Sequence, residues 1–267
     1  MTGFMTRERL AQDAAALGIR PGDMVIAHVA MSRVGPTLEG PDTLIGALID
    51  TIGPGGTLIG YTDWGTAYED IVDEDGRAPP AWRAYVAPFD PLTSRAIRHN
   101  GVFPEWLRTW PGAVRSASPG PSVVSVGARA DWVTADHALD YGYGPQSPFA
   151  RIVEARGKVM MIGAPHDTVT LLHHAEHLAD IPRKRIKRLE VPFATPAGTH
   201  WRMIEEYDTD DPVHPDLADD YFATIVADFL ATGEGGARAI GNAPSLLMDA
   251  ADLVAFAVRW LEGRGLT

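Results

Sequence analysis

The sequence predicts an α/β fold, with a mostly parallel central sheet covered by helices on both faces, an antiparallel hairpin and a long irregular insertion. Several short runs are continuously apolar, for example residues 24–29 and 158–163, as expected of strands buried on both faces. These runs alternate with segments of helical periodicity, an order typical of a parallel sheet. At 267 residues, with 45% hydrophobic and 22% charged residues, the chain fits one large domain over residues 1–267.

The elements of this layered core follow one another along the chain. Gly18 ends the first helix, and Pro41 begins the second, where its missing N–H costs nothing in a first helical turn. Gly53 ends that second helix. In chain order we predict a helix at 8–17, a strand at 24–29, a loop at 30–40, a helix at 41–53, a strand at 56–61, a helix at 148–155, a strand at 158–163 and a helix at 168–179.

Two further features lie in the last third of the chain. Residues 187–193 and 200–206 read as two strands joined through Pro196, Ala197 and Gly198, which predicts an antiparallel hairpin. Asp249 is a suitable N-cap for a final helix over residues 250–261.

Residues 62–121 interrupt the alternation of strands and helices. The segment is rich in Pro, Gly, aromatic and acidic residues, and only residues 103–110 read as a helix. A segment of this length with little regular structure is usually functional or disordered. Its aromatic residues argue against disorder, so we interpret it as an insertion that covers the substrate.

Composition limits the classes of function. The 35 acidic against 23 basic residues give a formal net charge of −12, which argues against a nucleic-acid partner and suits a cationic ligand. The same excess of acids is also common in proteins that need it only for solubility. The chain has no cysteine, which excludes disulfides, thiolate metal sites and a cysteine nucleophile.

The N-terminal residues contain no apolar core of a signal peptide. The longest apolar run of the C-terminal helix, residues 253–261, is interrupted by Arg259 and is too short to span a bilayer. We therefore expect a cytoplasmic protein that does not contact membranes.

A run of histidines and one glutamate, His173 to His177, matches the H-x-x-E-H pattern of inverted zinc peptidases. Histidines four apart on one helical face can share a metal ion, with Glu176 as base. That site needs a third ligand at an unspecified distance downstream. The alternative, which we favour for His174 and His177, is that they are solvated or half-buried helix residues.

Residues 238–243 fit the R-x-x-G-x-A pyrophosphate loop of the GNAT acetyltransferases. That loop binds phosphates through backbone N–H groups at a helix start. Here glycines at 233, 235 and 236 stand where the preceding strand is required, so we interpret the segment as a turn of small residues.

The loop after the first strand is a better candidate for binding a cofactor. In parallel sheets, ligands bind at the carboxyl ends of the strands, where this loop lies. Its backbone donors and polar side chains could hold a phosphate. The candidate cofactor-binding residues are Met31, Ser32, Arg33, Val34 and Gly35.

Ordered matches along nearly the whole chain resemble the aminoglycoside 3-N-acetyltransferases of the antibiotic acetyltransferase family. The most specific is Gly163-Ala164-Pro165 through Thr170-Leu171-Leu172-His173-His174-Ala175-Glu176. Other matches include Leu17-Gly18-Ile19-Arg20-Pro21-Gly22-Asp23, His28, Gly53-Pro54-Gly55-Gly56-Thr57-Leu58, Pro88-Phe89-Asp90-Pro91, Ser147-Pro148, Asp180-Ile181-Pro182 and Tyr207-Asp208.

This resemblance implies a fold unlike GNAT, with acetyl-CoA as donor and a 2-deoxystreptamine aminoglycoside as acceptor, and hence antibiotic resistance. It places His173 on the catalytic histidine of the family and implies that no metal is used. Glu176 is the candidate to orient His173, although an acid of the hairpin could do so instead. By periodicity alone His173 would be an exposed polar residue, because the apolar stripe of its helix faces away.

The resemblance also implies that acids and aromatic residues of the insertion and hairpin hold the ammonium groups of the substrate. We predict Asp63, Trp64, Tyr68, Glu69, Glu105, Glu206 and Asp208 as substrate-binding residues.

The chain departs from the family pattern at a few positions. Ala30 and Met31-Ser32 stand where Ser and Leu-Lys or Leu-Arg are frequent, so that Arg33 supplies the cation one position late, and Ser118 replaces a frequent histidine. We expect these differences to affect substrate range and cofactor contacts rather than the reaction.

Two alternatives to an acetyltransferase stay open. One is a zinc-dependent hydrolase that uses His173, Glu176 and His177. The other is a non-catalytic binder of polyamines or aminoglycosides, which the loss of His173 would favour. For any of these functions a monomer or a homodimer would suffice.

Overall fold

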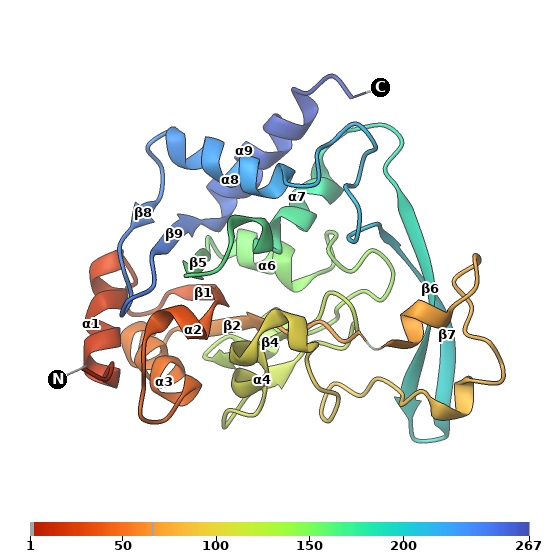
Figure 1. The fold of residues 1–267 in the computed structure, drawn as a ribbon, viewed down its shortest axis with the longest axis horizontal. Coiled ribbons are helices and arrows are strands. Elements are labelled where there is room, and N and C mark those ends of the chain that lie inside the picture. The colour runs from red at the N-terminus through yellow and green to blue at the C-terminus, as the bar shows by residue number, and fades with distance from the viewer. Residues whose placement is uncertain (1–2, 66, 267) are drawn as a thin grey trace.

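The computed structural model describes residues 3–65 and 67–266, without the side chains of Ala67 and Tyr68. A seven-stranded mixed sheet crosses the molecule in the order β3-β4-β2-β1-β5-β9-β8 (Figure 1). Its strands are β1 Met24–Val29, β2 Thr57–Tyr61, β3 Val114–Arg115, β4 Val123–Gly127, β5 Lys158–Ile162, β8 Gly236–Ala237 and β9 Ser245–Asp249. The three central strands are parallel, since β1 pairs with β2 on one side and β5 on the other. The strands outside these three each pair antiparallel with their neighbours.

Helices cover both faces of the sheet, as predicted. Alternate residues of β1 enter different cores: Met24 and Ile26 pack in one, Val25 and Ala27 in the other. The α-helices are α1 Arg7–Leu17, α2 Met31–Val34, α3 Pro41–Ile52, α4 Val102–Arg108, α5 Ala130–Thr134, α6 Pro148–Glu154, α7 Leu171–Leu178, α8 Tyr221–Ala231 and α9 Ala250–Glu262. Among the described residues, no helix combines the length and the apolar character needed to cross a membrane.

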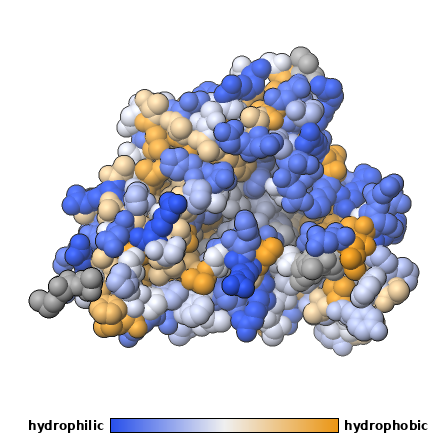
Figure 2. All heavy atoms as spheres, in the orientation of Figure 1, coloured by the Kyte–Doolittle hydropathy of each residue, from blue (hydrophilic) through white to orange (hydrophobic). Residues whose placement is uncertain are grey.

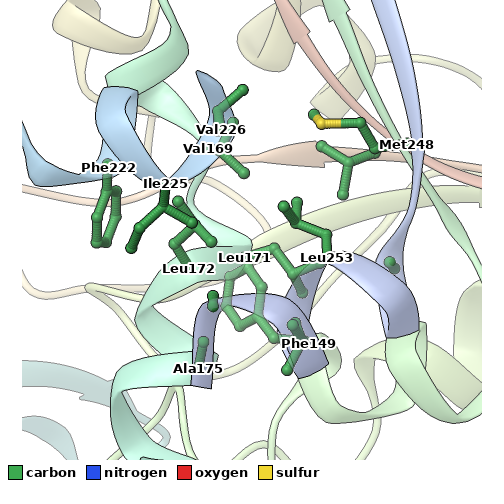
Figure 3. Close-up of a cluster of buried hydrophobic side chains, with 14 of the residues drawn as sticks. Phe149, Val169, Leu171, Leu172, Ala175, Phe222, Ile225, Val226, Met248 and Leu253 are labelled. Carbon is green, nitrogen blue, oxygen red and sulfur yellow. The ribbon is translucent and has the colours of Figure 1, made fainter. Parts of the chain in front are cut away.

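The first core fixes the position of α7, which carries the H-x-x-E-H residues. Leu171, Leu172 and Ala175 of this helix are buried against side chains of α8 and α9, among them Ile225 and Leu253 (Figure 3). Helix α9 begins where the sequence predicts, because the carboxylate of Asp249 accepts hydrogen bonds from the backbone of Ala251 and Asp252.

A two-stranded antiparallel ribbon, β6 Ile186–Thr195 and β7 Gly198–Tyr207, stands at one end of the molecule (Figure 1). This is the predicted hairpin, with longer strands. The insertion packs on this hairpin. Phe89 forms an isolated β-bridge with Phe193, and both residues lie beside the buried Trp64, Val191 and Ile204. Part of the insertion thus packs on the hairpin. The described part of residues 62–121 contains the 3₁₀ helices η1 Ala67–Ile71, η2 Arg83–Tyr85 and η3 Arg98–Asn100, together with α4 and β3.

Candidate active site

A histidine–glutamate pair on α7 forms the centre of the candidate site. The Nδ1 atom of His173 lies 2.6 Å from Oε2 of Glu176, three residues later on the same helical face. The other oxygen of Glu176 accepts a hydrogen bond from the buried hydroxyl of Tyr221 on α8. The imidazole contacts the rings of Tyr143 and Phe222, each with its centroid 4.8 Å from that of His173.

In this geometry Nδ1 of His173 faces the Glu176 carboxyl. Burial raises the pKa of the Glu176 carboxyl, although the neighbouring His173 opposes the rise. With Nδ1 donating to Glu176, Nε2 of the neutral ring is the acceptor. Periodicity alone predicted an exposed His173; the side chain is instead only 18% exposed, because Phe222 of α8 covers it.

The remaining histidines of the H-x-x-E-H motif have other partners. The Nδ1 atom of His174 lies 2.7 Å from the backbone oxygen of Tyr143, and burial lowers the pKa of this histidine. His177 Nε2 lies 2.8 Å from Oε1 of Glu206 on the hairpin. His174 is thus buried rather than solvated, and His177 is half-buried as expected. Within the described ranges, no group of three or more His, Cys, Asp or Glu side chains is arranged to hold a metal ion.

A cavity of about 610 Å³, which we name the outer cavity, lies between the insertion and the hairpin. On the face shown in Figure 2, hydrophilic side chains gather around a central hollow. Four predicted substrate-binding residues line the outer cavity: Asp63, Trp64, Glu69 and Glu206. The lining also includes five residues that sequence reasoning missed as ligands, namely Tyr61, Asp70, Tyr143, Lys187 and Asp210.

The outer cavity is strongly acidic. Burial, together with the charge of Glu69, raises the pKa of Asp63 to about 7. Burial also raises the pKa of Glu69. Crowded carboxyl groups of this kind favour a bound cation, which stabilises their charged forms. Lys187 already places one ammonium group there, 3.7 Å from Glu69 and paired with Asp210.

Two predicted substrate-binding residues, Glu105 and Asp208, do not line the outer cavity. Glu105 on α4 is engaged by two guanidinium groups, 2.9 Å from Arg95 and 2.7 Å from Arg108, and lies outside the cavity wall. The carboxylate of Asp208 accepts a hydrogen bond from the backbone N–H of Asp210 and orders the loop after β7. The side chain of Tyr68 lies outside the described residues.

A second cavity of about 450 Å³, the inner cavity, borders His173. His28, Ala30, Asn100 and Thr170 are also in its wall. Tyr61 lines both the outer and the inner cavity, and its hydroxyl lies 2.6 Å from that of Tyr143. The two cavities are therefore adjacent at Tyr61, and the Tyr143 ring lies against the ring of His173.

The predicted cofactor loop is mostly helical. Residues Met31–Val34 form α2, and Gly35 follows with φ of 105°, a value that favours glycine. Val34 is fully buried, its backbone included, so it presents no surface to a ligand. Arg33 lines a third cavity of about 410 Å³, the edge cavity, together with His166 and Arg238.

The segment with the R-x-x-G-x-A pattern is a tight turn, as predicted from its small residues. The backbone groups of Ile240 and Ala243 exchange hydrogen bonds across Gly241 and Asn242. Arg238, the first residue of the pattern, lines the edge cavity opposite α2.

Comparisons with known proteins give one consistent result. A family model described as aminoglycoside 3-N-acetyltransferase matches residues 26–262. Aminoglycoside N(3)-acetyltransferase III of Pseudomonas aeruginosa is 44% identical over 97% of this chain and 94% of its own. A solved structure described as AAC-IIIb in a binary complex with CoASH superposes with a TM-score of 0.98 at 64% identity, covering 99% of each chain. Sisomicin-bound AAC-VIa gives a TM-score of 0.92 at 36% identity, covering 98% of this chain and 99% of its own.

Proposed function

Because this chain belongs to the aminoglycoside 3-N-acetyltransferase family, we propose that it transfers the acetyl group of acetyl-CoA to the 3-amine of a 2-deoxystreptamine aminoglycoside. Acetylation removes one positive charge from the antibiotic and confers resistance. The observation that carries this proposal is the His173–Glu176 pair beside the junction of an acidic cavity with a second cavity.

His173 is the general base of the reaction. An aminoglycoside amine cannot attack a thioester until it has lost its proton. The ammonium group first releases one proton to solvent. As the neutral amine attacks, Nε2 of His173 takes a second proton from its nitrogen, and Glu176 stabilises the imidazolium that forms. The amine nitrogen bonds to the acetyl carbon, the carbon–sulfur bond breaks, and the CoA thiolate leaves with the proton that His173 held.

The outer cavity binds the aminoglycoside. Asp63, Glu69 and Glu206 hold its ammonium groups, and Trp64 forms an apolar wall. Asp208 supports this site by ordering the loop that carries Asp210, and Tyr68 belongs to the same segment as Glu69. Glu105 is excluded from this proposal, because two arginines neutralise it outside the cavity.

The thioester of acetyl-CoA lies in the inner cavity, close to His173. Arg33, His166 and Arg238 border the edge cavity and supply positive charge for the phosphates. The cofactor passes beside the backbone of α2 and Gly35, which includes Met31, Ser32 and Val34. No metal takes part, since the motif histidines have separate partners.

The working unit is one domain over residues 1–267, in which residues 62–121 cover the substrate. It acts in the cytoplasm as a monomer or homodimer, without nucleic acid or membrane, in keeping with the net charge of −12. Light scattering after size-exclusion chromatography tests the oligomeric state.

The test of the reaction is thiol release from acetyl-CoA in the presence of single aminoglycosides. We expect release that depends on both substrates, and a loss of about 10²–10⁴-fold in kcat for His173→Gln. His200→Gln, which changes an exposed histidine of the hairpin, is the matched control and keeps full activity. A non-catalytic binder would release no thiol.

Chelation separates this function from the zinc hydrolase. Dialysis against a chelator should leave the rate of thiol release unchanged. Loss of activity that added zinc restores would contradict an acetyltransferase without metal.

A further inference from the structure

The inner cavity is bordered by two buried polar side chains that lack a hydrogen-bond partner. Nε2 of His28, on β1, and Nδ2 of Asn100, in η3, are both inaccessible and unpaired. Three other side chains among the described residues share this property, namely Ser118, Ser125 and His214. Only His28 and Asn100 also line one of the three cavities described above.

A buried polar group without a partner destabilises the folded protein. Most such groups in folded proteins are paired, and those that are not are concentrated at functional sites. Two unpaired groups from separate segments, both at the wall of one cavity, therefore indicate a ligand that supplies their missing partner. The cavity of about 450 Å³ has room for that ligand.

The chemistry of the two groups defines the atom that they would bind. Asn100 Nδ2 can only donate. Burial lowers the pKa of His28 to about 4, so its ring is neutral near pH 7 and carries one N–H. In the tautomer with hydrogen on Nε2, His28 is a second neutral donor in addition to Asn100. Two neutral donors on residues that line one cavity suit an oxygen acceptor that carries partial or developing negative charge.

We propose that the Nε2–H of His28 and the Nδ2–H of Asn100 bind the thioester carbonyl oxygen of acetyl-CoA and stabilise the oxyanion formed from it. This inference rests on the acetyl transfer proposed above. The amine nitrogen attacks the carbonyl carbon, and His173 Nε2 takes the amine proton. The carbonyl electron pair moves to the oxygen between the two donors, then returns as the carbon–sulfur bond breaks and the thiolate takes the proton from His173.

The location of the base supports the thioester carbonyl over the amide carbonyls elsewhere in CoA. His173 borders the same cavity as His28 and Asn100, and proton transfer occurs within hydrogen-bond reach of the reacting centre. The oxygen that gains charge in the reaction is therefore the acceptor expected opposite these donors.

Substitution by leucine tests each donor separately. In His28→Leu and Asn100→Leu the N–H is lost and an apolar group of comparable size remains. We expect kcat to fall about 10²–10³-fold in each, the usual effect of removing one oxyanion donor. His28→Gln keeps an N–H near the position of Nε2 and should retain more activity than His28→Leu.

Binding of CoASH is the discriminating measurement, because CoASH has the amide carbonyls of the donor but no thioester carbonyl. Its Kd should stay within about threefold of wild type in both leucine variants. The melting temperatures should equal or exceed that of wild type, since an apolar group replaces an unpaired polar one. A purely structural role predicts lower melting temperatures.

His214→Leu is the matched control, because His214 is also a buried histidine with an unpaired Nε2 but lies outside the three cavities. It should keep the wild-type kcat. If His28→Leu does not fold, His28→Gln and Asn100→Leu carry the test.

Two results would overturn the inference. One is a kcat within fivefold of wild type in His28→Leu and Asn100→Leu. The other is a weakening of CoASH binding that accounts for the lost activity, which would assign the donors to the amide carbonyls. Failure of the proposed function itself is distinct, since wild-type protein would then release no thiol with any aminoglycoside.

Discussion

The carboxylate of Glu176 is shared between a histidine and a tyrosine. Oε2 binds His173 and Oε1 accepts from Tyr221, so Tyr221 fixes the rotation of the carboxylate that orients the base. The hydroxyl has no contact with a cavity described here. Tyr221 is therefore a positioning residue, whose effect reaches the substrates through Glu176 and His173.

Removal of this hydroxyl should slow turnover without weakening substrate binding. In Tyr221→Phe we expect kcat to fall by roughly tenfold, because a hydrogen bond to a buried charged group contributes about 1.5–3 kcal/mol and its loss frees the carboxylate. Both KM values should stay near wild type in steady-state assays. Tyr85→Phe, at an exposed tyrosine, is the control. A rise in KM with unchanged kcat would contradict a positioning role.

Asp63 should make folding stability depend on pH. Its folded pKa of about 7 lies above the ordinary aspartate value of 3.8, so between these values the folded protein holds a proton that the unfolded chain has lost. Stability relative to Asp63→Asn therefore falls as pH rises from about 4 to 7, by at most about 1.4 kcal/mol per pH unit, and levels off above 7.

Urea unfolding of both proteins at several pH values measures this difference, and a bound aminoglycoside should reduce it by stabilising the charged carboxylate. Parallel stability curves for wild type and Asp63→Asn would show that Asp63 titrates at its ordinary pKa.

Local sequence patterns could predict only part of the site. His173 was identified by family resemblance, whereas its periodicity indicated an exposed residue. The covering ring is Phe222, which lies 49 residues further along, and no pattern within α7 encodes it. Tyr143 likewise lies in an irregular segment and reaches His173 only through the tertiary fold.

At the scale of elements, the parallel centre of the sheet was predictable and its flanks were not. Strands β1, β2 and β5 are apolar runs between helices and were found from that pattern. The strands β4 and β9 pair antiparallel with the centre. Neither follows a helix in the alternating order that revealed the central strands, since β4 comes directly after β3 and β9 directly after β8. Helix α8 was also missed, although it supplies both Tyr221 and Phe222.

The hairpin contributes one basic and one acidic residue to the outer cavity, Lys187 and Glu206. Lys187 occupies a position between Glu69 and Asp210 that would suit an ammonium group of the substrate. Its removal should therefore strengthen binding of a cation.

In Lys187→Met we expect the aminoglycoside KM to fall by about three- to tenfold and to depend more steeply on salt. Lys187→Arg keeps the charge and serves as the control, with KM near wild type. Initial rates at low and high salt provide the measurement. A higher KM in Lys187→Met would mean that the lysine holds the acids in position for the substrate.

At the scale of the whole molecule, the residues that follow the three parallel strands lie at one edge of the sheet. Ala30 follows β1, Asp63 comes shortly after β2, and Thr170 follows β5 through η4 His166–Thr168. These residues line the outer or inner cavity, in agreement with the rule that ligands bind at the carboxyl ends of parallel strands. The antiparallel hairpin and the insertion then enclose the acidic side of that edge (Figure 1).

This arrangement predicts that both substrates are bound when the acetyl group moves. The outer and inner cavities share Tyr61 in their walls, which suits direct transfer between a thioester in one and an amine in the other, without an enzyme-bound acetyl group. The absence of cysteine removes the side chain that most readily forms such an intermediate. Double-reciprocal plots at several fixed concentrations of the second substrate should therefore give intersecting lines. Incubation with acetyl-labelled donor alone should leave the protein unlabelled by mass spectrometry, whereas parallel lines with an acetylated serine or threonine would establish transfer through the enzyme instead.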